Sequence, residues 1–446
     1  MRIACVHVPQ FALQSLSRLD PSLRGAPVAV VGAGVDPAAG VRPSLALHSP
    51  IVLACSRAAW ALGVRLGMTA TAARFVSSEI RVVAADAALE RETVRAIADA
   101  LLGVSPVVDV GGRVAVGGAH LAMYCEVPSK TRGTTFGERL LARLDGFGIA
   151  ARIGIADDRF TAWVAAAHAG DGDGRARSED RGVVSVPRGG SAAFLAPRPL
   201  SLLAITPEVQ HMLEALGVRT LGEFAALPAP SVSRPLEADY QALARGDSGC
   251  ALRPYTPDAT IREELVVGST GNLFGGANAA AVLAERVALR LAGRARGAQR
   301  LEISIFGDRG ERIVPVTAPV AASSPHELVE LIAPPIGEAL GANARLRVLV
   351  IGEALVGTAS GAQGDDAATI DAGSAAHASL GTAMPALALG HLAPLARPGR
   401  GLPWQLSAPE TLRSERRDAH RRTRRAKPRR RAVTPAQSVL FGALDG

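Results

Sequence analysis

The chain has 446 residues and a formal net charge of +8, with 48% hydrophobic and 20% charged residues. This length exceeds one ordinary domain, and the composition is that of a globular rather than a disordered protein. No run of 18 or more apolar residues occurs, and the four scattered cysteines form no CxxC pair. These features argue against a membrane span, a zinc site and a disulfide framework, so we expect a cytoplasmic protein of several domains.

The first residues, RIACVHVPQFALQ, predict a buried strand over residues 3–8 and a helix that begins near Phe11. His7 and Pro9 lie at the junction, and no acidic residue precedes Asp20. A strand-to-helix corner is a common place for catalytic carboxylates. Their absence here therefore bears on function.

Strand and helix signals alternate through the first 195 residues. Apolar runs that end in turn residues predict strands, and apolar residues at helical spacing predict helices. The strands are expected at 26–32, 51–56, 113–118 and 151–156, and the helices at 88–104 and 136–148. This order predicts an α/β layer with a βαβ-like rhythm.

Two short amphipathic helices are predicted between residues 202 and 228, on either side of the turn LGVRT. Thr220 and Glu223 fit the T-x-x-E capping box of a helix start. The pair resembles a helix-hairpin-helix, a small unit that often binds the DNA backbone. Many αα-hairpins share this pattern, so it is weak by itself.

Residues 263–355 predict the order β-α-β-β-α-β, which is the arrangement of the split βαβ motif. In the first helix of this unit Arg286, Arg290 and Arg294 recur at four-residue steps and therefore lie along one helix face. We expect this stripe either to contact phosphate or to form a solvated face.

The C-terminal part has a different composition. Residues 357–385 are rich in Ala, Gly and Ser and predict a flexible linker. Residues 413–431 hold 11 Lys/Arg and 2 Asp/Glu, a net charge of 11 − 2 = +9, so the remaining chain sums to 8 − 9 = −1. Such a basic run stays solvated and extended.

Arginine binds phosphate bidentately, so nucleic acid is the expected partner of this basic run, with a solubilising tail as the alternative. The arginines concerned are Arg416, Arg417, Arg421, Arg422, Arg424, Arg425, Arg429, Arg430 and Arg431.

The succession of modules resembles the palm, fingers, thumb and little finger of Y-family translesion DNA polymerases. Residues 53–74, with Gly63, Val64, Gly67 and Met68, are similar to the Gly-Val-x-x-Gly-Met turn of the family's fingers, and residues 151–169 are similar to a palm strand and helix. The resemblance covers about residues 1–355. It implies an α+β multidomain protein. Its palm would cover residues 1–195 with fingers inserted at 16–80, followed by a helix-hairpin-helix thumb at 196–255 and a little finger at 256–355. A flexible linker at 356–412 and a disordered basic tail at 413–446 would complete the chain.

The chain departs from this family at the metal site. Active members align two Mg²⁺ ions with carboxylates, and Mg²⁺ requires oxygen ligands. Asp109 is the only acid between Ser105 and Cys125, and a shift of register could restore that one carboxylate alone. The positions that correspond to the expected carboxylates hold His7, Pro9, Val110 and Gly111.

The nucleotide pocket departs in the same way. Arg57 and Trp60 occupy the positions of the fingers residues that contact the triphosphate, and Trp163 occupies that of the palm lysine. His7 could also be considered as a metal ligand, but no second ligand lies at a suitable spacing, so we expect a packed or solvated histidine. We therefore predict no catalytic residues, no metal and no cofactor.

Near the end of the sequence, Gln437, Leu440 and Phe441 of QSVLF match the bacterial clamp-binding pentapeptide Gln-x-x-Leu-Phe. Such a peptide places an amide in a polar notch and two apolar side chains in a hydrophobic pocket. A chance match is the alternative, since residues 210–213 fit the first four positions inside a predicted helix.

Together these features resemble the catalytically degenerate, polymerase-like proteins of bacterial mutagenesis cassettes. The resemblance implies a cytoplasmic, nucleoid-associated adaptor in DNA-damage tolerance that binds DNA and the sliding clamp. It also implies recruitment of an error-prone C-family polymerase and a RecA-like accessory protein, with no role at a membrane. Two alternatives stay open: an active polymerase with an unusual metal arrangement, and a nucleic-acid-binding protein of another kind.

Overall fold

The computed structural model describes residues 1–32, 50–114, 120–168, 182–228, 235–249, 251–268, 276–307, 310–339 and 344–356. The predicted basic tail and the clamp-binding peptide lie outside the described residues, as does the predicted linker beyond residue 356.

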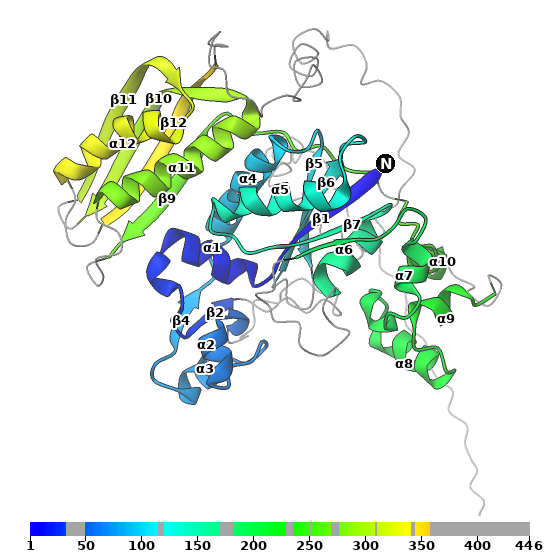
Figure 1. Ribbon diagram of the computed structural model, residues 1–446. Coiled ribbons are helices and arrows are strands. Elements are labelled where there is room, and N and C mark those ends of the chain that lie inside the picture. Colours follow the sequence, from blue (N-terminus) through cyan, green and yellow to red (C-terminus); the bar gives the residue numbers. More distant parts are fainter. Residues whose placement is uncertain are drawn as a thin grey trace, which may run out of the picture. The chain divides into compact units, whose positions relative to one another are not determined.

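A five-stranded sheet with β1 at its centre forms the first layer (Figure 1). The strands are β1 (Arg2–Val8), β5 (Val108–Val114), β6 (His120–Val127), β7 (Arg152–Ala156) and β8 (Val183–Ser185), in the order β5-β6-β1-β7-β8. β1 runs antiparallel to both β6 and β7, and only β7 and β8 are parallel.

The predicted βαβ-like rhythm is present, since β6 and β7 both run antiparallel to β1 and are therefore parallel to each other. Its first strand was predicted at 113–118, which is wrong, because β6 follows β5 in an antiparallel hairpin and precedes the next helix. The sequence pattern did not predict β6, although most of its residues are buried. Its sequence HLAMYCEV is almost continuously apolar, and a strand covered on both faces lacks the alternation that marks a half-exposed one.

Helices cover both faces of this sheet (Figure 1). α4 (Ala87–Leu102) and α5 (Gly133–Asp145) cover one face, where Val6, Val8 and Met123 are buried. α6 (Arg159–His168) covers the other face, against Cys5 and Tyr124. The sheet that contains the opening strand is thus covered by a packed hydrophobic core on each of its two faces.

A smaller sheet lies within the predicted fingers. It contains β2 (Val28–Gly32), β3 (Ile51–Cys55) and β4 (Arg81–Ala84), with β2 antiparallel to β3 and parallel to β4. Its two faces are covered by α1 (Phe11–Leu19), and by α2 (Arg57–Ala61) with α3 (Ala70–Val76). Ser56 and Thr69 cap the starts of α2 and α3, because each hydroxyl accepts a backbone N–H of the first turn.

Short helices form the predicted thumb region: α7 (Ser191–Leu195), α8 (Pro207–Ala215), α9 (Leu221–Ala225) and α10 (Pro235–Ala244). The capping box predicted at the start of α9 is confirmed. The Thr220 hydroxyl accepts the Glu223 N–H, and the Glu223 carboxylate accepts the Thr220 N–H at 2.9 Å.

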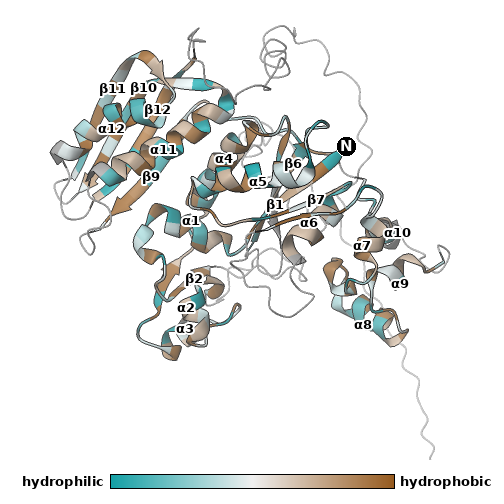
Figure 2. Ribbon diagram, viewed as in Figure 1, coloured by the Kyte–Doolittle hydropathy of each residue, from teal (hydrophilic) through white to brown (hydrophobic). Residues whose placement is uncertain are grey.

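A four-stranded antiparallel sheet forms the last described unit, in the order β11-β10-β12-β9. Its elements follow in the order β9 (Ile261–Val267), α11 (Gly276–Arg294), β10 (Arg296–Gly307), β11 (Gly310–Ala322), α12 (Pro325–Ala339) and β12 (Ala344–Leu355). Both helices pack on one face of the sheet, over an aliphatic core (Figures 1 and 2). Arg262 and Glu264 of β9 lie on the opposite face, whereas Glu263 lies on the face that the helices cover.

The arginine stripe of α11 is buried, so the expectation of a solvated face is wrong. The Arg290 side chain has no exposed surface; its Nε lies 2.8 Å from Asp99 Oδ2, and its Nη1 lies 3.0 Å from Glu263 Oε1. Arg294 Nη2 is 2.8 Å from the same Asp99 oxygen, and Arg286 is also buried. A guanidinium already bonded to buried carboxylates is poorly placed for phosphate, so we do not assign DNA contact to this stripe.

Burial and the neighbouring charges shift the pKa values of residues in this cluster. Burial and the nearby Arg18 lower the pKa of Arg286 to about 9. Burial alone would raise the pKa of Glu263, but Arg18, Arg290 and Arg286 hold it below its ordinary value. Each buried charge therefore depends on the opposite charges around it.

Asp99→Asn should destabilise the protein by about 3 kcal/mol, because removal of one partner leaves buried guanidinium charge without compensation. The matched control is Asp258→Asn, which breaks a half-exposed pair with Arg95 at 2.9 Å and should cost less than about 1 kcal/mol. Urea unfolding of the two variants measures the difference. Equal costs would show that the buried network does not contribute in this way.

Candidate functional site

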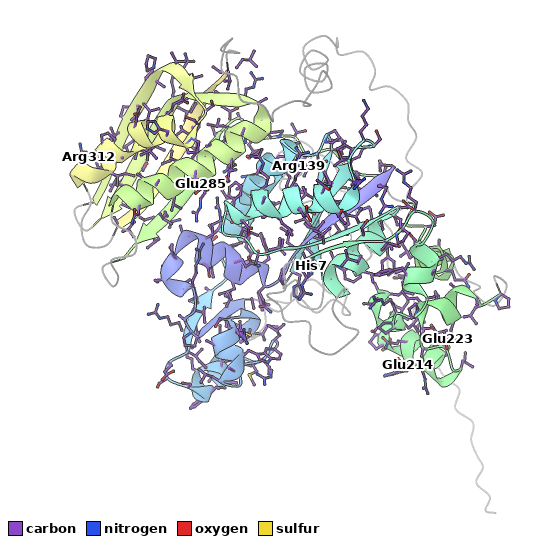
Figure 3. The ribbon with its side chains drawn as sticks, in the orientation of Figure 1. His7, Arg139, Glu214, Glu223, Glu285 and Arg312 are labelled. Carbon is purple, nitrogen blue, oxygen red and sulfur yellow. The ribbon has the colours of Figure 1, made fainter. Side chains whose placement is uncertain are left out.

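The end of β1 is the position at which the family resemblance places metal-binding acids. His7 lies between Ala122 of β6 and Arg152 of β7 in the sheet register, so these three side chains share one face. His7, labelled in Figure 3, is buried. Its ring stacks on that of His120 with centroids 5.1 Å apart. The side chains gathered here are two imidazoles and a guanidinium, none of which supplies the oxygen ligands that Mg²⁺ requires.

Pro9 and the residues after it form a corner held by hydrogen bonds. Gln14 donates from Nε2 to Pro9 O at 2.6 Å and to Ala150 O at 3.0 Å. Gln10 has a positive φ of 49° and accepts the Cys55 N–H of β3 at 2.9 Å. The polar groups of this corner therefore connect the end of β1 to β3 and to the segment that precedes β7.

The β5–β6 hairpin cannot place an acid where one was expected. Val110 is half-buried and packs against the core on the α4 side of the sheet. Gly111 has a φ of +57°, and a Cβ atom there would lie only 1.9 Å from Ala122 O. The register of the hairpin shifts between Asp109 and Gly112. The backbone itself thus excludes a side chain at Gly111.

Asp109, the one acid of this hairpin, is used inside the protein. It is buried, and its Oδ2 accepts Arg159 Nη1 at 2.9 Å and the Arg253 N–H at 2.8 Å. Arg159 also lies over the Tyr124 ring, 4.2 Å from its centroid. Asp109 therefore holds α6 and the chain segment after the thumb region against β5.

The acids at the start of α6 have structural partners too. Asp158 caps the helix by accepting the Thr161 N–H at 2.9 Å, and burial raises the pKa of its carboxyl. Asp157 accepts the Gly189 N–H at 2.7 Å. Across the described ranges, no group of three or more His, Cys, Asp or Glu residues is arranged to hold a metal ion.

The nucleotide-pocket positions also have roles in packing. Trp60 is 47% exposed on α2, and the Arg65 guanidinium lies 4.2 Å from its ring centroid while donating to Trp60 O. Trp163 is buried in the core that α6 shares with the thumb helices, against Phe160. Arg57 is exposed at the start of α2. Trp163 thus serves as a core residue, and neither tryptophan supplies a charge that could contact a triphosphate.

Sequence reasoning missed His120, Arg152 and Arg159. None of them belongs to a motif, and only the pairing of β1 with β6 and β7 places the first two beside His7. A prediction of β6 would have brought His120 to attention, since it is the first residue of that strand.

Comparison with known proteins relates the chain to DNA polymerases. Residues 6–167 match the model of the impB/mucB/samB family. The chain is 34% identical over 108 residues to the DNA polymerase IV of Dehalococcoides mccartyi strain CBDB1, covering 24% of this chain and 25% of that protein. It is 26% identical over 321 residues to the DNA polymerase IV of D. mccartyi strain 195, covering 69% of this chain and 74% of that protein.

Among solved structures, the insertion ternary complex of Dbh DNA polymerase matches with a TM-score of 0.44 and 14% identity, over 78% of this chain and 98% of that one. DinB from Sulfolobus solfataricus matches with a TM-score of 0.41 and 13% identity, over 80% of this chain and all of that one. The match to the strain CBDB1 protein spans about a quarter of that relative's length. The chain thus contains a region similar to the impB/mucB/samB family and has DNA polymerase IV proteins as relatives.

No helix among the described residues is long and apolar enough to cross a membrane.

Gly111→Ala should destabilise the protein by about 3 kcal/mol, because an L side chain there is strained by the positive φ and collides with the Ala122 carbonyl. Gly67→Ala is the control, with a φ of +82° but open space around its Cβ, and should cost about 1 kcal/mol. Thermal unfolding of both variants tests this. A similar loss at both sites would mean that the hairpin backbone can relax to admit a side chain.

Proposed function

We propose that the chain is a non-catalytic, polymerase-like adaptor of the ImuB type, which acts in DNA-damage tolerance and induced mutagenesis. The observation that carries this proposal is the chemistry at the end of β1, where His7, His120 and Arg152 gather and Gly111 admits no side chain. Phosphoryl transfer with two metal ions requires carboxylates that bridge those ions. A site of this composition can hold nucleic acid but lacks the groups to extend it.

DNA is the first proposed partner. The basic run at 413–431 supplies nine arginines, from Arg416 to Arg431, that would bind phosphate without base specificity. The open face of the β11-β10-β12-β9 sheet supplies further arginines, in place of the buried stripe of α11. Affinity from such contacts should fall steeply as salt concentration rises, because each phosphate contact releases counterions.

The sliding clamp is the second proposed partner, through Gln437, Leu440 and Phe441. A peptide that becomes ordered on binding depends on a few anchors, here one amide and two large apolar side chains. The competing match at residues 210–213 lies in α8, where Leu213 is buried in the core. That helix cannot present Leu213 to a partner without unfolding, which supports the C-terminal peptide.

An error-prone C-family polymerase and a RecA-like accessory protein are the remaining proposed partners. An adaptor that lacks catalysis must deliver another polymerase to the DNA that it holds, and the clamp would place both at the same primer end. The described residues suggest no particular surface for these two proteins.

The triple change Gln437→Ala/Leu440→Ala/Phe441→Ala should reduce clamp binding at least about tenfold, because it removes all three anchors. A matched triple change at Gln210, Glu208 and His211, all to Ala on the surface of α8, should leave clamp binding unchanged. Surface plasmon resonance with immobilised bacterial clamp measures both. Clamp binding that survives the C-terminal change would show that QSVLF is a chance match.

A second candidate is an active translesion polymerase with an altered metal site, favoured by the names of its relatives, which are DNA polymerase IV. Template-directed incorporation of nucleotides distinguishes this candidate from the adaptor. A DNA-binding protein of another kind would neither incorporate nucleotides nor bind the clamp.

A further inference from the structure

The two short helices that cover the sheet of β2, β3 and β4 bury small side chains and expose large apolar ones. α2 and α3 pack against this sheet through Ala59, Ala70 and Ala73, none of which is more than 6% exposed. On the same helices Trp60 is 47% exposed and Phe75 is 85% exposed. A helix that only covers a sheet places its large apolar residues inward, so packing of the core does not account for these two side chains.

The exposed apolar residues gather where the two helices end. Leu62 and Leu66 follow α2 and are 41% and 39% exposed, and Val76, the last residue of α3, is 36% exposed. A Cβ atom at Gly63 would lie 3.5 Å from Val76 Cγ1, so the turn after α2 contacts the end of α3. The Gly63 N–H donates to Trp60 O at 3.0 Å and holds this turn in place. We define the α2–α3 patch as Trp60, Leu62, Leu66, Phe75 and Val76.

Arginines beside these residues give the surface a positive charge. The Arg65 guanidinium carbon lies 4.2 Å from the centroid of the Trp60 ring, and Arg65 Nη1 donates to Trp60 O at 2.7 Å. Arg74, which precedes Phe75, is exposed. Residues 50–84 hold four arginines and one glutamate, a net charge of 4 − 1 = +3. The complement of an apolar surface with cationic neighbours is a surface of apolar side chains flanked by carboxylates.

Two other occupants fit the α2–α3 patch less well. In a two-fold contact with a second copy of the chain, each set of arginines would face the same arginines of the partner, and like charges repel. A nucleic-acid strand would stack its bases on free aromatic rings. Three of the five patch residues are aliphatic, and one face of the Trp60 ring already carries the Arg65 guanidinium. The residue types therefore favour a protein.

We propose that the α2–α3 patch is a docking site for a partner protein, which presents an apolar segment flanked by Asp or Glu residues. The exposed apolar side chains are the anchors that lose water on binding, and Arg65 and Arg74 meet the acids at the edge. Because Arg65 already holds the Trp60 ring, less side-chain entropy is lost when the partner binds. This inference goes beyond the proposed adaptor function, since the surface alone defines the partner.

Peptides selected on the purified full-length protein supply the probe. A phage-displayed library of random peptides is selected on wild-type protein and counter-selected on the variant Leu62→Ser/Phe75→Ser. The variant retains the basic run at 413–431, so counter-selection removes acidic peptides that bind only that run. The enriched peptides should combine apolar residues with flanking Asp or Glu residues.

Fluorescence anisotropy with an enriched synthetic peptide measures the contribution of the anchors. Leu62→Ser/Phe75→Ser should weaken binding at least about tenfold, because it removes two anchors. The matched control is Met212→Ser/Leu216→Ser at α8, where the two side chains are 53% and 74% exposed, and it should leave binding unchanged. Thermal unfolding of each variant establishes that it is folded.

Charge reversal tests the chemistry of the partner separately. Arg74→Glu should weaken binding of the same peptide at least about threefold, because a carboxylate replaces a cation beside the acids of the peptide. Arg139→Glu makes the same change at an exposed position of α5 and should leave binding unchanged.

Three results would overturn the docking site. The first is a failure to enrich acid-flanked apolar peptides, or peptides that bind Leu62→Ser/Phe75→Ser as tightly as wild type. The second is an oligothymidylate affinity that falls in this variant, which would make the patch a nucleic-acid surface. The third is a wild-type dimer that this variant dissociates in sedimentation velocity, which would make a second copy the occupant. None of these results depends on whether the protein extends a primer, so the proposed function is tested independently.

Discussion

The position of β1 at the centre of its sheet is the constraint on which the rest of the structure depends. Antiparallel pairing on both sides fixes its register, and helices bury both of its faces. Cys5, Val6 and Val8 meet that requirement with apolar side chains, and nothing in the pairing requires an acid at residue 7 or 9. The fold and the chemistry of this strand are separable, so the fold can persist while the residues at its end change.

Charged residues in the interior hold segments of the chain together. Asp99 accepts Arg290, Arg294 and the Tyr255 hydroxyl, and Asp109 accepts Arg159 and the Arg253 backbone. Both carboxylates thereby fix the stretch around residues 253–255 against the first sheet, where the Tyr255 N–H also donates to Val108 O at 2.7 Å. Asp99 and Asp109 are therefore structural residues.

The sequence predicted features that are local. The opening strand and helix, the capping box of Thr220 and Glu223 and the polar junction at His7 follow from patterns a few residues long. Three features depended on distant partners and were not predictable in this way. Burial of the α11 arginines depends on Asp99, about 190 residues earlier in the chain. Arginines at four-residue steps give the same sequence pattern whether their helix face is buried or exposed to water.

The hairpin at Gly111 is the second feature that local sequence patterns did not predict. The positive φ and the close approach of Ala122 O arise from a register shift at the pair Gly111-Gly112. Such a pair is a turn or bulge signal, but it does not specify the opposing residue. The third is the pairing of Glu264 with Arg345 and Arg347, because these residues come from two strands, β9 and β12, that only the fold brings side by side. Residue types at single positions were informative about chemistry, but their partners came from topology.

The most direct test of the account is template-directed primer extension by the purified full-length protein with Mg²⁺ or Mn²⁺ and all four nucleotides, beside a DNA polymerase IV as the positive control. The account predicts that the primer stays unextended while gel-shift analysis shows that the same DNA is bound. Extension that follows the template sequence and copurifies with the protein would contradict it.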